Sequence, residues 1–229
     1  MAEQTKKSGG NTALWLFTPL LMLLLCGGIG LLGFTLAPTH TLQKYLNIAF
    51  MDDLKATSST SGLNIVNKEI ETEKTPETVY EVGEVVAPKF GEQYAVLECK
   101  DINLKVGVYF GSNSELLALG ACQSSNSAIL GNSGNTVIDA HVNTYFADLH
   151  KMEVGDQVTL YTEYGKFTYE AAELIRFSKK DQTYVSATED DRLTLYTCEA
   201  QVLGNSDIRV GAVCKLTDSE FYRAPVIDD

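Results

Sequence analysis

The chain has few basic residues and few histidines, and both shortages narrow the functions it can have. Its 229 residues include 18 Lys and Arg against 30 Asp and Glu, which gives a formal net charge of −12, and only three His. Nucleic-acid phosphates and anionic membrane surfaces are bound by clusters of Lys and Arg. The composition therefore argues against a nucleic-acid partner and against a basic membrane-binding face. We expect an acidic surface of this kind to be solvated.

Paired metal-binding motifs are also missing. The sequence has no C-x-x-C pair and no Cys/His cluster with the spacing of a zinc site, so we expect no metal and no cofactor. An acidic triplet, Glu189–Asp191, offers hard oxygen ligands of the kind Ca²⁺ prefers, but we expect it to be only a solvated loop. Cys26 lies in an apolar run, and four cysteines follow it at irregular spacing: Cys99, Cys122, Cys198 and Cys214. Four exported cysteines can form two disulfides, and composition leaves their pairing open.

Long apolar runs are absent except near the N-terminus. Positions 8 to 39 carry no charged residue, and Ala13–Ala37 is almost continuously apolar. At about 1.5 Å per residue this run spans a hydrocarbon core of roughly 30 Å, whereas the apolar region of a signal peptide is only about 7 to 15 residues long. Thr35–Ala37 is faintly similar to a cleavage site, but we expect Pro38 to block cutting there. We predict an uncleaved transmembrane signal anchor at 13–37, with a removed signal peptide as the alternative.

Flanking charges predict the orientation of this anchor. Lys6 and Lys7 precede the run, whereas its far side has His40 and Lys44 and then the acidic pair Asp52-Asp53. Because positive flanks stay inside, residues 1–12 are predicted to be cytoplasmic and everything after the anchor to be extracellular. The predicted protein is therefore held by the lipid bilayer through one N-terminal helix, at the cell membrane.

Residues 38–84 are predicted to connect the anchor to an external domain. They begin with a pattern typical of a short juxtamembrane helix, and Ala56–Glu84 is rich in Ser, Thr, Glu and Lys and poor in large apolar residues. Such a composition is typical of a flexible, solvated, acidic stalk. A lid that folds over the active site is the alternative.

Residues 85–229 have the pattern of an all-β domain. Ser112–Leu119 alone predicts a helix, with Ser112 or Ser114 as its N-cap, and Tyr164-Gly165 predicts a tight hairpin. Many short strands at near-regular spacing predict a barrel or a sandwich. The predicted strands are β-branched or aromatic and are bounded by Gly, Asn, Asp or Ser: Tyr94–Cys99, Leu104–Phe110, Thr136–Asp139, Gln157–Tyr161, Lys166–Glu170, Leu193–Thr197 and Ile208–Val213.

The phase of two strands predicts a shared outer face. Because side chains alternate across a strand, the leucines of Leu193–Thr197 face the core and Cys198 faces the wetter side. In Ile208–Val213 the small apolar residues face the core, which leaves Arg209 on the other side and places Cys214 inside. If the two strands pair as neighbours, Cys198 and Arg209 share the solvent-facing surface.

A thiol, an imidazole and a guanidinium on separate strands are what thiol-based acyl transfer needs. The thiolate of Cys198 is a nucleophile when a nearby base can form it, and His141 can take that proton and return it to a leaving amine. Arg209 stays charged, and its rigid fork suits a carbonyl oxygen that becomes an oxyanion. Each residue alone is usually structural, so the hypothesis depends on whether the three converge.

These residues lie in segments that resemble one family. Thr194–Cys198 resembles the T-L-x-T-C signature of sortases, the cysteine transpeptidases of Gram-positive surfaces. Gly134–Phe146 is similar to the family's segment around its catalytic histidine, and Val154–Val158 to the strand that follows it. Arg209, within Asp207–Val213, falls where the family places its arginine.

The resemblance covers about Val85 to Leu216 and has two departures. Sortases commonly have Gly before the histidine and Arg after it, where this chain has Ala140 and Val142, and we interpret both as subfamily variation. The Asp-Pro-aromatic lid motif of pilin-polymerising sortases is absent, as is the C-terminal membrane span common in that class. The resemblance therefore favours protein anchoring over pilin polymerisation.

The resemblance implies a fold, a reaction and partners. The fold would be a closed or nearly closed sortase-type β-barrel with one or two short helices. Cys198 would attack a carbonyl in the C-terminal sorting motif of a secreted protein and form a thioester. His141 would act as general acid and base, and Arg209 would position the substrate and stabilise the oxyanion. The acceptor would be an amine of a peptidoglycan cross-bridge or of its precursor.

The resemblance also places a substrate groove next to this site. Residues that recognise the motif are expected on loops between Lys166 and Arg192. Four residues are expected to support the groove: Thr194, Tyr196, Thr197 and Ala140. Two alternatives stay open, a surface cysteine hydrolase that uses water and a catalytically inactive sortase-like binding domain.

Overall fold

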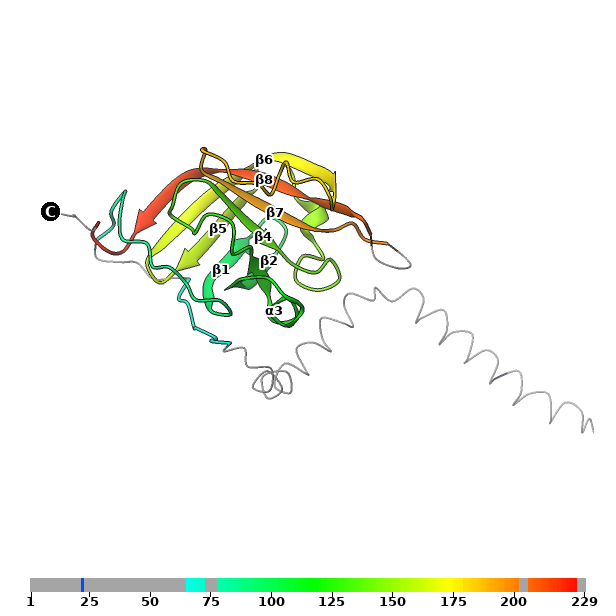
Figure 1. The fold of residues 1–229 in the computed structure, drawn as a ribbon, viewed down its shortest axis with the longest axis horizontal. Coiled ribbons are helices and arrows are strands. Elements are labelled where there is room, and N and C mark those ends of the chain that lie inside the picture. The colour runs from blue at the N-terminus through cyan, green and yellow to red at the C-terminus, as the bar shows by residue number, and fades with distance from the viewer. Residues whose placement is uncertain (1–21, 23–64, 73–77, 202–205, 226–229) are drawn as a thin grey trace, which may run out of the picture. The chain divides into compact units, whose positions relative to one another are not determined.

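The computed structural model describes Met22 and residues 65–72, 78–201 and 206–225. The chain divides into two units, Met1–Leu42 and Gln43–Asp229, and the described part of the second unit forms a β-barrel (Figure 1). Within the described residues, no helix has both the length and the apolar character needed to cross a membrane. The predicted cytoplasmic terminus, the anchor at 13–37 and the juxtamembrane helix lie outside the described residues, apart from Met22.

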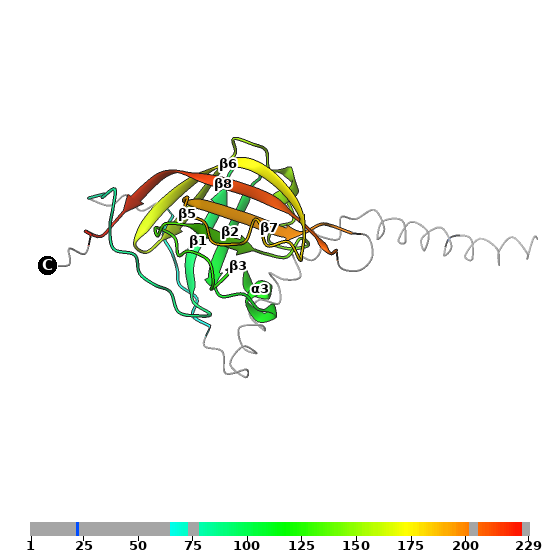
Figure 2. The ribbon, with the colours of Figure 1, turned by 45° about the horizontal axis from the view of Figure 1, so that its top comes forward.

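The barrel is closed, in agreement with the closed or nearly closed barrel that the resemblance to sortases implies. Its eight described strands are hydrogen-bonded in the order β1-β2-β3-β4-β7-β8-β6-β5. Figure 2 shows β7 and β8 side by side across the wall of the barrel. The strand bounds are β1 Gln93–Cys99, β2 Leu104–Phe110, β3 Ala121–Gln123, β4 Asn135–Asp139, β5 Gln157–Thr162, β6 Gly165–Ser178, β7 Arg192–Cys198 and β8 Ile208–Phe221.

Two strands are longer than the sequence predicts. β6 and β8 pair antiparallel from Gly165↔Phe221 to Ser178↔Ile208, well beyond the predicted Lys166–Glu170 and Ile208–Val213. The register of β6 shifts between Thr168 and Tyr169 and again between Ala171 and Glu173, which breaks the alternation of apolar residues. The second half of β8 carries exposed polar side chains, so neither extension has a continuous hydrophobic pattern.

Two small elements differ from the prediction. The helix α3 spans Ser114–Leu119, and its N-cap is Asn113, whose Oδ1 accepts a 2.8 Å hydrogen bond from the Leu116 N–H. The predicted N-caps Ser112 and Ser114 are therefore wrong, because the asparagine between them supplies the capping oxygen. The strand β3, with three residues, was not predicted because it is too short to show alternation; it pairs parallel to β2 and antiparallel to β4.

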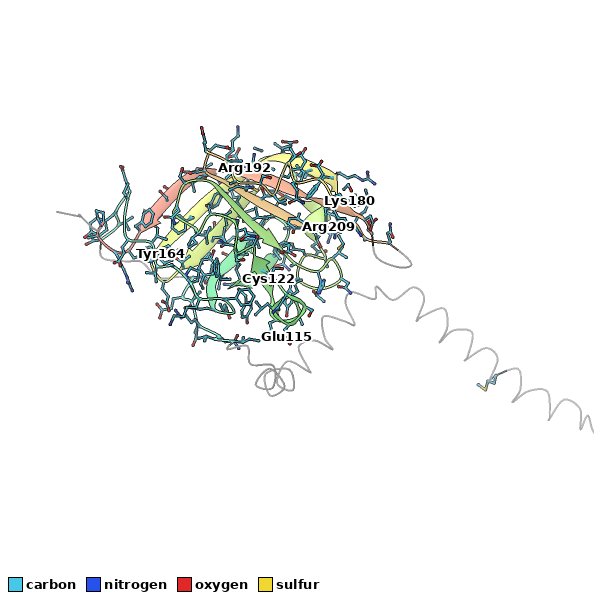
Figure 3. All side chains as sticks on the ribbon, in the orientation of Figure 1. Glu115, Cys122, Tyr164, Lys180, Arg192 and Arg209 are labelled. Atoms are coloured by element: carbon cyan, nitrogen blue, oxygen red, sulfur yellow. The ribbon has the colours of Figure 1, made fainter. Side chains whose placement is uncertain are left out.

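The interior of the barrel is filled by apolar side chains from all eight described strands, among the side chains of Figure 3. In β7 the predicted phase is confirmed, because Leu193 and Leu195 are fully buried in this core. Burying a side chain of this size contributes about 1.5–3 kcal/mol, so these leucines fix which face of β7 points inward. Cys214 is also in the core, as predicted.

A hydroxyl closes the predicted hairpin between β5 and β6. Thr162 Oγ1 accepts hydrogen bonds from the N–H groups of Tyr164, at 3.2 Å, and of Gly165, at 2.8 Å. It also donates to the Gly165 carbonyl oxygen at 2.9 Å. The tight turn at Tyr164-Gly165 is thus confirmed.

Part of the expected stalk lies against the barrel. We call residues 65–72 and 78–84 the strap. Val66 forms a parallel bridge with Glu92, and Ile70 is buried against Val96 and Tyr161. A few apolar residues make these contacts within a polar segment, and its average composition, which predicts a solvated stalk, conceals them.

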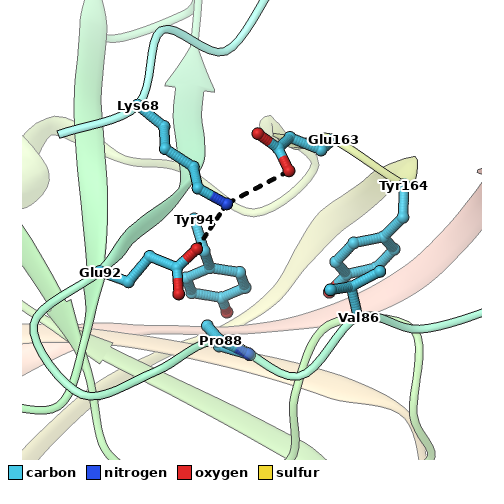
Figure 4. A pocket seen from close by; sticks show the side chains of 7 residues that line it. All are labelled: Lys68, Val86, Pro88, Glu92, Tyr94, Glu163 and Tyr164. Atoms are coloured by element: carbon cyan, nitrogen blue, oxygen red, sulfur yellow. Dashed lines mark hydrogen bonds and ion pairs between the residues drawn. The ribbon is translucent and has the colours of Figure 1, made fainter. Parts of the chain in front are cut away.

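Polar contacts hold both parts of the strap. Lys68 Nζ lies 2.5 Å from a carboxylate oxygen of Glu92 and 3.3 Å from one of Glu163, between the two acids in Figure 4. Further along, Tyr80 and Phe221 exchange two backbone hydrogen bonds of 2.9 Å. The strap therefore joins the start of β1 and the end of β8 on the outside of the barrel.

Candidate active site

Cys198 and Arg209 are directly paired in the structure. The last residue of β7 is Cys198, and the β7–β8 register sets it opposite Arg209, near the start of β8. Paired residues of antiparallel strands point to the same face, so the two side chains share the outer surface. Both are partly exposed. The Arg209 Nη1 donates to the carbonyl oxygens of Ser206, at 2.9 Å, and Ile208, at 3.3 Å.

His141 follows the neighbouring strand. β4 pairs parallel to β7 up to Asp139↔Tyr196, and His141 and Cys198 each lie two residues beyond this last pair. Ile138 and Ala140 are buried in the core whereas His141 is exposed, so the alternation continues past the end of β4. His141 therefore lies on the outer side, as Cys198 and Arg209 do. The parallel pairing of β4 with β7 brings the three residues to one end of the barrel.

Among the four described cysteines, Cys198 differs from the rest. All four are free thiols, and Cys99, Cys122 and Cys214 have no exposed surface. Burial raises the pKa of Cys99, and it raises the pKa of Cys122 and of Cys214 to about 12, so these thiols stay protonated. The partly exposed Cys198 is the one described thiol that a substrate can reach without unfolding.

One hydrogen bond ties the histidine segment to the cysteine strand. Thr197, which is buried, donates from Oγ1 to the Ala140 carbonyl oxygen at 2.7 Å. Thr197 precedes Cys198, and Ala140 precedes His141. This bond therefore sets the spacing of the two segments that carry Cys198 and His141. Two of the expected groove-supporting residues therefore act as a fastening inside the barrel wall.

A third such residue, Thr194, holds a loop. Its Oγ1 donates to Asn135 Oδ1 at 2.8 Å, and the Asn135 Nδ2 donates to the carbonyl oxygens of Tyr184 and Ser186 at 2.9 Å. Thr194 and Asn135 are almost completely buried. This chain of bonds attaches the β6–β7 loop, residues 179–191, to the barrel.

The fourth, Tyr196, belongs to an apolar cluster on the outer face. Its ring packs edge-on against Phe177 of β6 at a centroid separation of 5.8 Å, and Phe177 also contacts Tyr184 of the β6–β7 loop. Val185 and Val213 join the same cluster. Of the span Lys166–Arg192 in which motif-recognising loops were expected, the structure has the first part as strand β6 and only 179–191 as loop.

A charged residue on this face was not identified from the sequence. Asp139, paired with Tyr196, is partly buried, and its Oδ1 accepts a 3.4 Å hydrogen bond from Ser112 Oγ. Burial raises the pKa of Asp139 to about 6, against the opposing effects of the Ser112 bond and of the Arg209 charge. The sequence does contain an indication of its position. Asp139 is two residues before His141, so strand alternation points both side chains away from the core.

One group of potential metal ligands exists within the described part of the chain. Donor atoms of Cys99, Asp101 and Asp156 lie within 4.8 Å of one another. Asp101 accepts a hydrogen bond from the Gln157 N–H at 3.2 Å, and Asp156 accepts one from the Glu153 N–H at 2.9 Å. Asp156 thus stabilises a local turn, whereas Asp101 links the turn after β1 to the start of β5, and the group shares no residue with the Cys198 site.

Fold and site together define a class of protein. It is a closed, eight-stranded β-barrel whose neighbouring β4, β7 and β8 segments present a histidine, a cysteine and an arginine at one end. The sequence profile of the Sortase domain matches residues 85–217. The chain belongs to the sortase family. Known sortases are cysteine transpeptidases.

A curated relative agrees with this assignment. The chain is 30% identical over 112 residues to Sortase D of Bacillus subtilis (strain 168), and the match covers 48% of this chain and 57% of that protein. The matched region is therefore less than two thirds of the relative's length.

Solved structures of sortases have the same fold. The catalytic domain of SrtD from B. anthracis is 27% identical, with a TM-score of 0.51, and the match covers 60% of this chain and 96% of that one. A Sortase D5 transpeptidase from Clostridium perfringens is 25% identical, with a TM-score of 0.52 over 56% of this chain and 81% of that one. Sortase A of Listeria monocytogenes, at 22% identity, has a TM-score of 0.51 over 56% and 89% of the two chains and shows likeness of fold alone.

Proposed function

We propose that this chain is a sortase-type cysteine transpeptidase that uses Cys198 as nucleophile, His141 as general acid and base, and Arg209 to position the substrate and stabilise the oxyanion. The pairing of Cys198 with Arg209, with His141 one strand away, is the observation that carries the proposal. This pairing places a reachable thiol, a solvent-exposed imidazole and a permanent cation on one face of the barrel.

The first half-reaction forms a thioester. The Cys198 thiol loses its proton to His141, and the sulfur bonds to a backbone carbonyl carbon in the sorting motif of a secreted protein. The oxygen becomes an oxyanion that Arg209 stabilises. The C–N bond then breaks, and the leaving amine takes the proton from His141.

The second half-reaction moves the acyl group to a new amine. An amine of a peptidoglycan cross-bridge or of its precursor attacks the thioester carbon and gives a proton to His141. The C–S bond breaks, and the Cys198 thiolate recovers that proton. No oxidant, metal or cofactor takes part in either step.

The proposed location matches this chemistry. An anchor at 13–37 would hold the chain in the cell membrane with its N-terminus in the cytoplasm and the barrel outside, where both the secreted substrates and the cell-wall amines are found. The uncharged apolar run and its flanking charges support this topology.

A ligation assay tests the proposal. The full chain, purified in a mild detergent, is incubated with a small library of sorting-motif peptides and an amine acceptor, and products are identified by mass spectrometry. We expect cleavage and ligation for at least one peptide and neither for Cys198→Ala. Product from the Cys198→Ala protein, or none from the wild type with any peptide, would contradict the assignment.

The same assay separates the alternatives. Because His141 is exposed, water can also reach the thioester, which keeps a cysteine hydrolase as the second candidate. Cleavage that proceeds while added amine gives no ligated product would identify the hydrolase. Absence of both reactions, together with peptide binding, would identify a binding domain.

A further inference from the structure

Asp139 lies on the face used by the proposed site. β4 and β7 pair Asp139 with Tyr196, and β7 and β8 pair Cys198 with Arg209. Tyr196 and Cys198 are two residues apart and therefore point the same way, as do Asp139 and His141. The outer face of three neighbouring strands thus carries an acid, a phenol, a thiol and a guanidinium.

Electrostatic contacts agree with this arrangement. The pKa of Tyr196 is raised first by burial, then also by Asp139 and Cys198, and it is lowered by Arg209. The Arg209 charge likewise lowers the pKa of Asp139. The phenol therefore lies within range of all three groups, and the carboxyl lies within range of the guanidinium.

The surroundings of Asp139 can be named element by element. Cys122 of β3 is its antiparallel partner, and the Asp139 charge raises the pKa of that thiol. Ser112, just before α3, donates the 3.4 Å hydrogen bond to Oδ1. Tyr196 faces it from β7 and Arg209 from β8. Among these described groups, Arg209 is the one positive charge that opposes burial of the carboxylate.

We propose that Asp139 is a positioning residue of the site, whose ionised carboxylate attracts the Arg209 guanidinium across β7 and holds it on the face where Cys198 acts. This role rests on the proposed transpeptidation, in which Arg209 touches the substrate. The carbonyls of Ser206 and Ile208 accept hydrogen bonds from one amino group of Arg209 as neutral groups. Asp139 adds a full negative charge that attracts the guanidinium over a longer distance, without a direct hydrogen bond.

This role makes the site dependent on pH. Burial raises the pKa of Asp139 to about 6, so the carboxyl changes from mostly protonated to mostly ionised between about pH 5 and pH 7. Protonation removes the attraction, and the guanidinium is then held by the two carbonyls alone. The contribution of Asp139 to activity is therefore lost as the pH falls.

The first test compares Asp139→Asn with wild type across pH, using the full chain and the ligation assay. The ratio of wild-type to variant kcat/KM at each pH separates the contribution of Asp139 from pH effects that both proteins share. We expect this ratio to be roughly ten to one hundred at pH 8 and to approach one below pH 5, with a midpoint near pH 6. Asp218→Asn, an exposed acid in the second half of β8, serves as the control and should give a ratio of one throughout. A ratio that does not change with pH overturns the role.

A double-mutant cycle tests the route through Arg209. If Asp139 acts by holding the guanidinium, Asp139→Asn should reduce kcat/KM less in an Arg209→Lys background than in wild type. Reductions that simply multiply would overturn the coupling.

A third measurement needs no substrate. The Arg209 charge lowers the pKa of Asp139, so Arg209→Gln should raise the pH midpoint of the Asp139 carboxyl, followed by NMR. An unshifted midpoint overturns the electrostatic coupling. Wild-type protein that ligates no peptide overturns the proposed function instead, and the carboxyl midpoint then still decides whether Asp139 and Arg209 interact.

Discussion

Thr197 and Ala140 fasten the two chain segments that carry the proposed nucleophile and base. The 2.7 Å bond from the buried Thr197 hydroxyl to the Ala140 carbonyl oxygen runs between β7 and the end of β4, one residue before Cys198 on one side and one before His141 on the other. A hydroxyl in the fourth position of the T-L-x-T-C signature therefore has a structural explanation that does not require contact with substrate.

Replacing this hydroxyl tests the explanation. Thr197→Val keeps the shape of the side chain but leaves the Ala140 carbonyl oxygen without this donor, which is expected to cost about 1–3 kcal/mol of unfolding free energy. Because His141 loses its fixed spacing from Cys198, kcat/KM for ligation should fall about tenfold or more. Urea unfolding and the ligation assay measure the two effects. Thr217→Val, which removes a 3.0 Å bond from an exposed threonine, is the control and should change neither by much.

The cysteines are expected to differ in reactivity. In a Cys26→Ala background, which removes the one cysteine outside the described residues, iodoacetamide should modify the folded chain once, at Cys198. Three thiols buried and held protonated should react only after denaturation: Cys99, Cys122 and Cys214. Peptide mapping by mass spectrometry identifies the modified residue. Rapid modification of Cys122 or Cys214 in the folded protein would contradict the burial described for them.

Asp139 should also affect stability in a pH-dependent way. Its pKa is raised on folding from 3.8 to about 6, so the stability contributed by the protonated carboxyl is fully present below about pH 3.8 and is lost as the pH rises through about 6. A shift of about two pKa units corresponds to about 3 kcal/mol. Asp139→Asn is therefore expected to raise the unfolding free energy at pH 8 by up to about 3 kcal/mol and to change it little near pH 3.5. Urea titrations at both pH values measure this; a variant less stable than wild type at pH 8 would show that the carboxylate is satisfied by its surroundings.

The strap is expected to stabilise the folded protein more through one buried apolar side chain than through its ion pairs. Ile70→Ala removes a buried contact with Val96 and Tyr161 and should cost about 2–4 kcal/mol. Lys68→Ala breaks pairs with Glu92 and Glu163 that are partly exposed to solvent, and should cost less than about 1 kcal/mol. Thermal unfolding of the two variants at equal salt gives the comparison. Equal losses, or a larger loss for Lys68→Ala, would contradict the packing of Ile70.

Asn135 is expected to matter for substrate affinity. Asn135→Ala removes both bonds to the carbonyls of Tyr184 and Ser186 and leaves the buried Thr194 hydroxyl without its acceptor. The β6–β7 loop should then open more readily, raising KM for peptide more than it lowers kcat. Protease cleavage within 179–191 provides a second readout that needs no substrate. Unchanged KM and unchanged cleavage would show that the loop is held by other contacts.

Most of the fold could be predicted because alternation in the short strands is strong. Leu104–Phe110 was predicted with the bounds that β2 has, and the phase of β7 correctly separated Leu195 from Cys198. The second halves of β6 and β8, beyond the predicted bounds, could not be predicted, because bulges and exposed polar residues interrupt their hydrophobic pattern. Where long-range pairing rather than local pattern decides the structure, as for β3, the sequence alone carries no signal.

The proposed site was predictable as a set of residue types, and its arrangement depends on pairing. Strand alternation predicted that Cys198 and Arg209 lie on one face, and the observed register shows that they are direct partners. Asp139 was overlooked because it is one polar residue at the end of a short strand, and its relation to Tyr196 and Arg209 follows only from the pairing of β4, β7 and β8. The strap was overlooked for a similar reason, since Ile70 is a single apolar residue within a polar segment.

If residues 13–37 anchor the chain in a bilayer as proposed, the strap would also limit how far the barrel can move from that bilayer. With the proposed anchor ending at Ala37, a chain free up to Val85 could extend to about 170 Å, whereas a chain bound to the barrel from Val66 onward can extend to about 100 Å at most. The barrel would therefore work in a thinner layer above the membrane, where its local concentration relative to membrane-bound substrates is higher. A change that releases the strap would lower that concentration even if the chemistry at Cys198 were untouched.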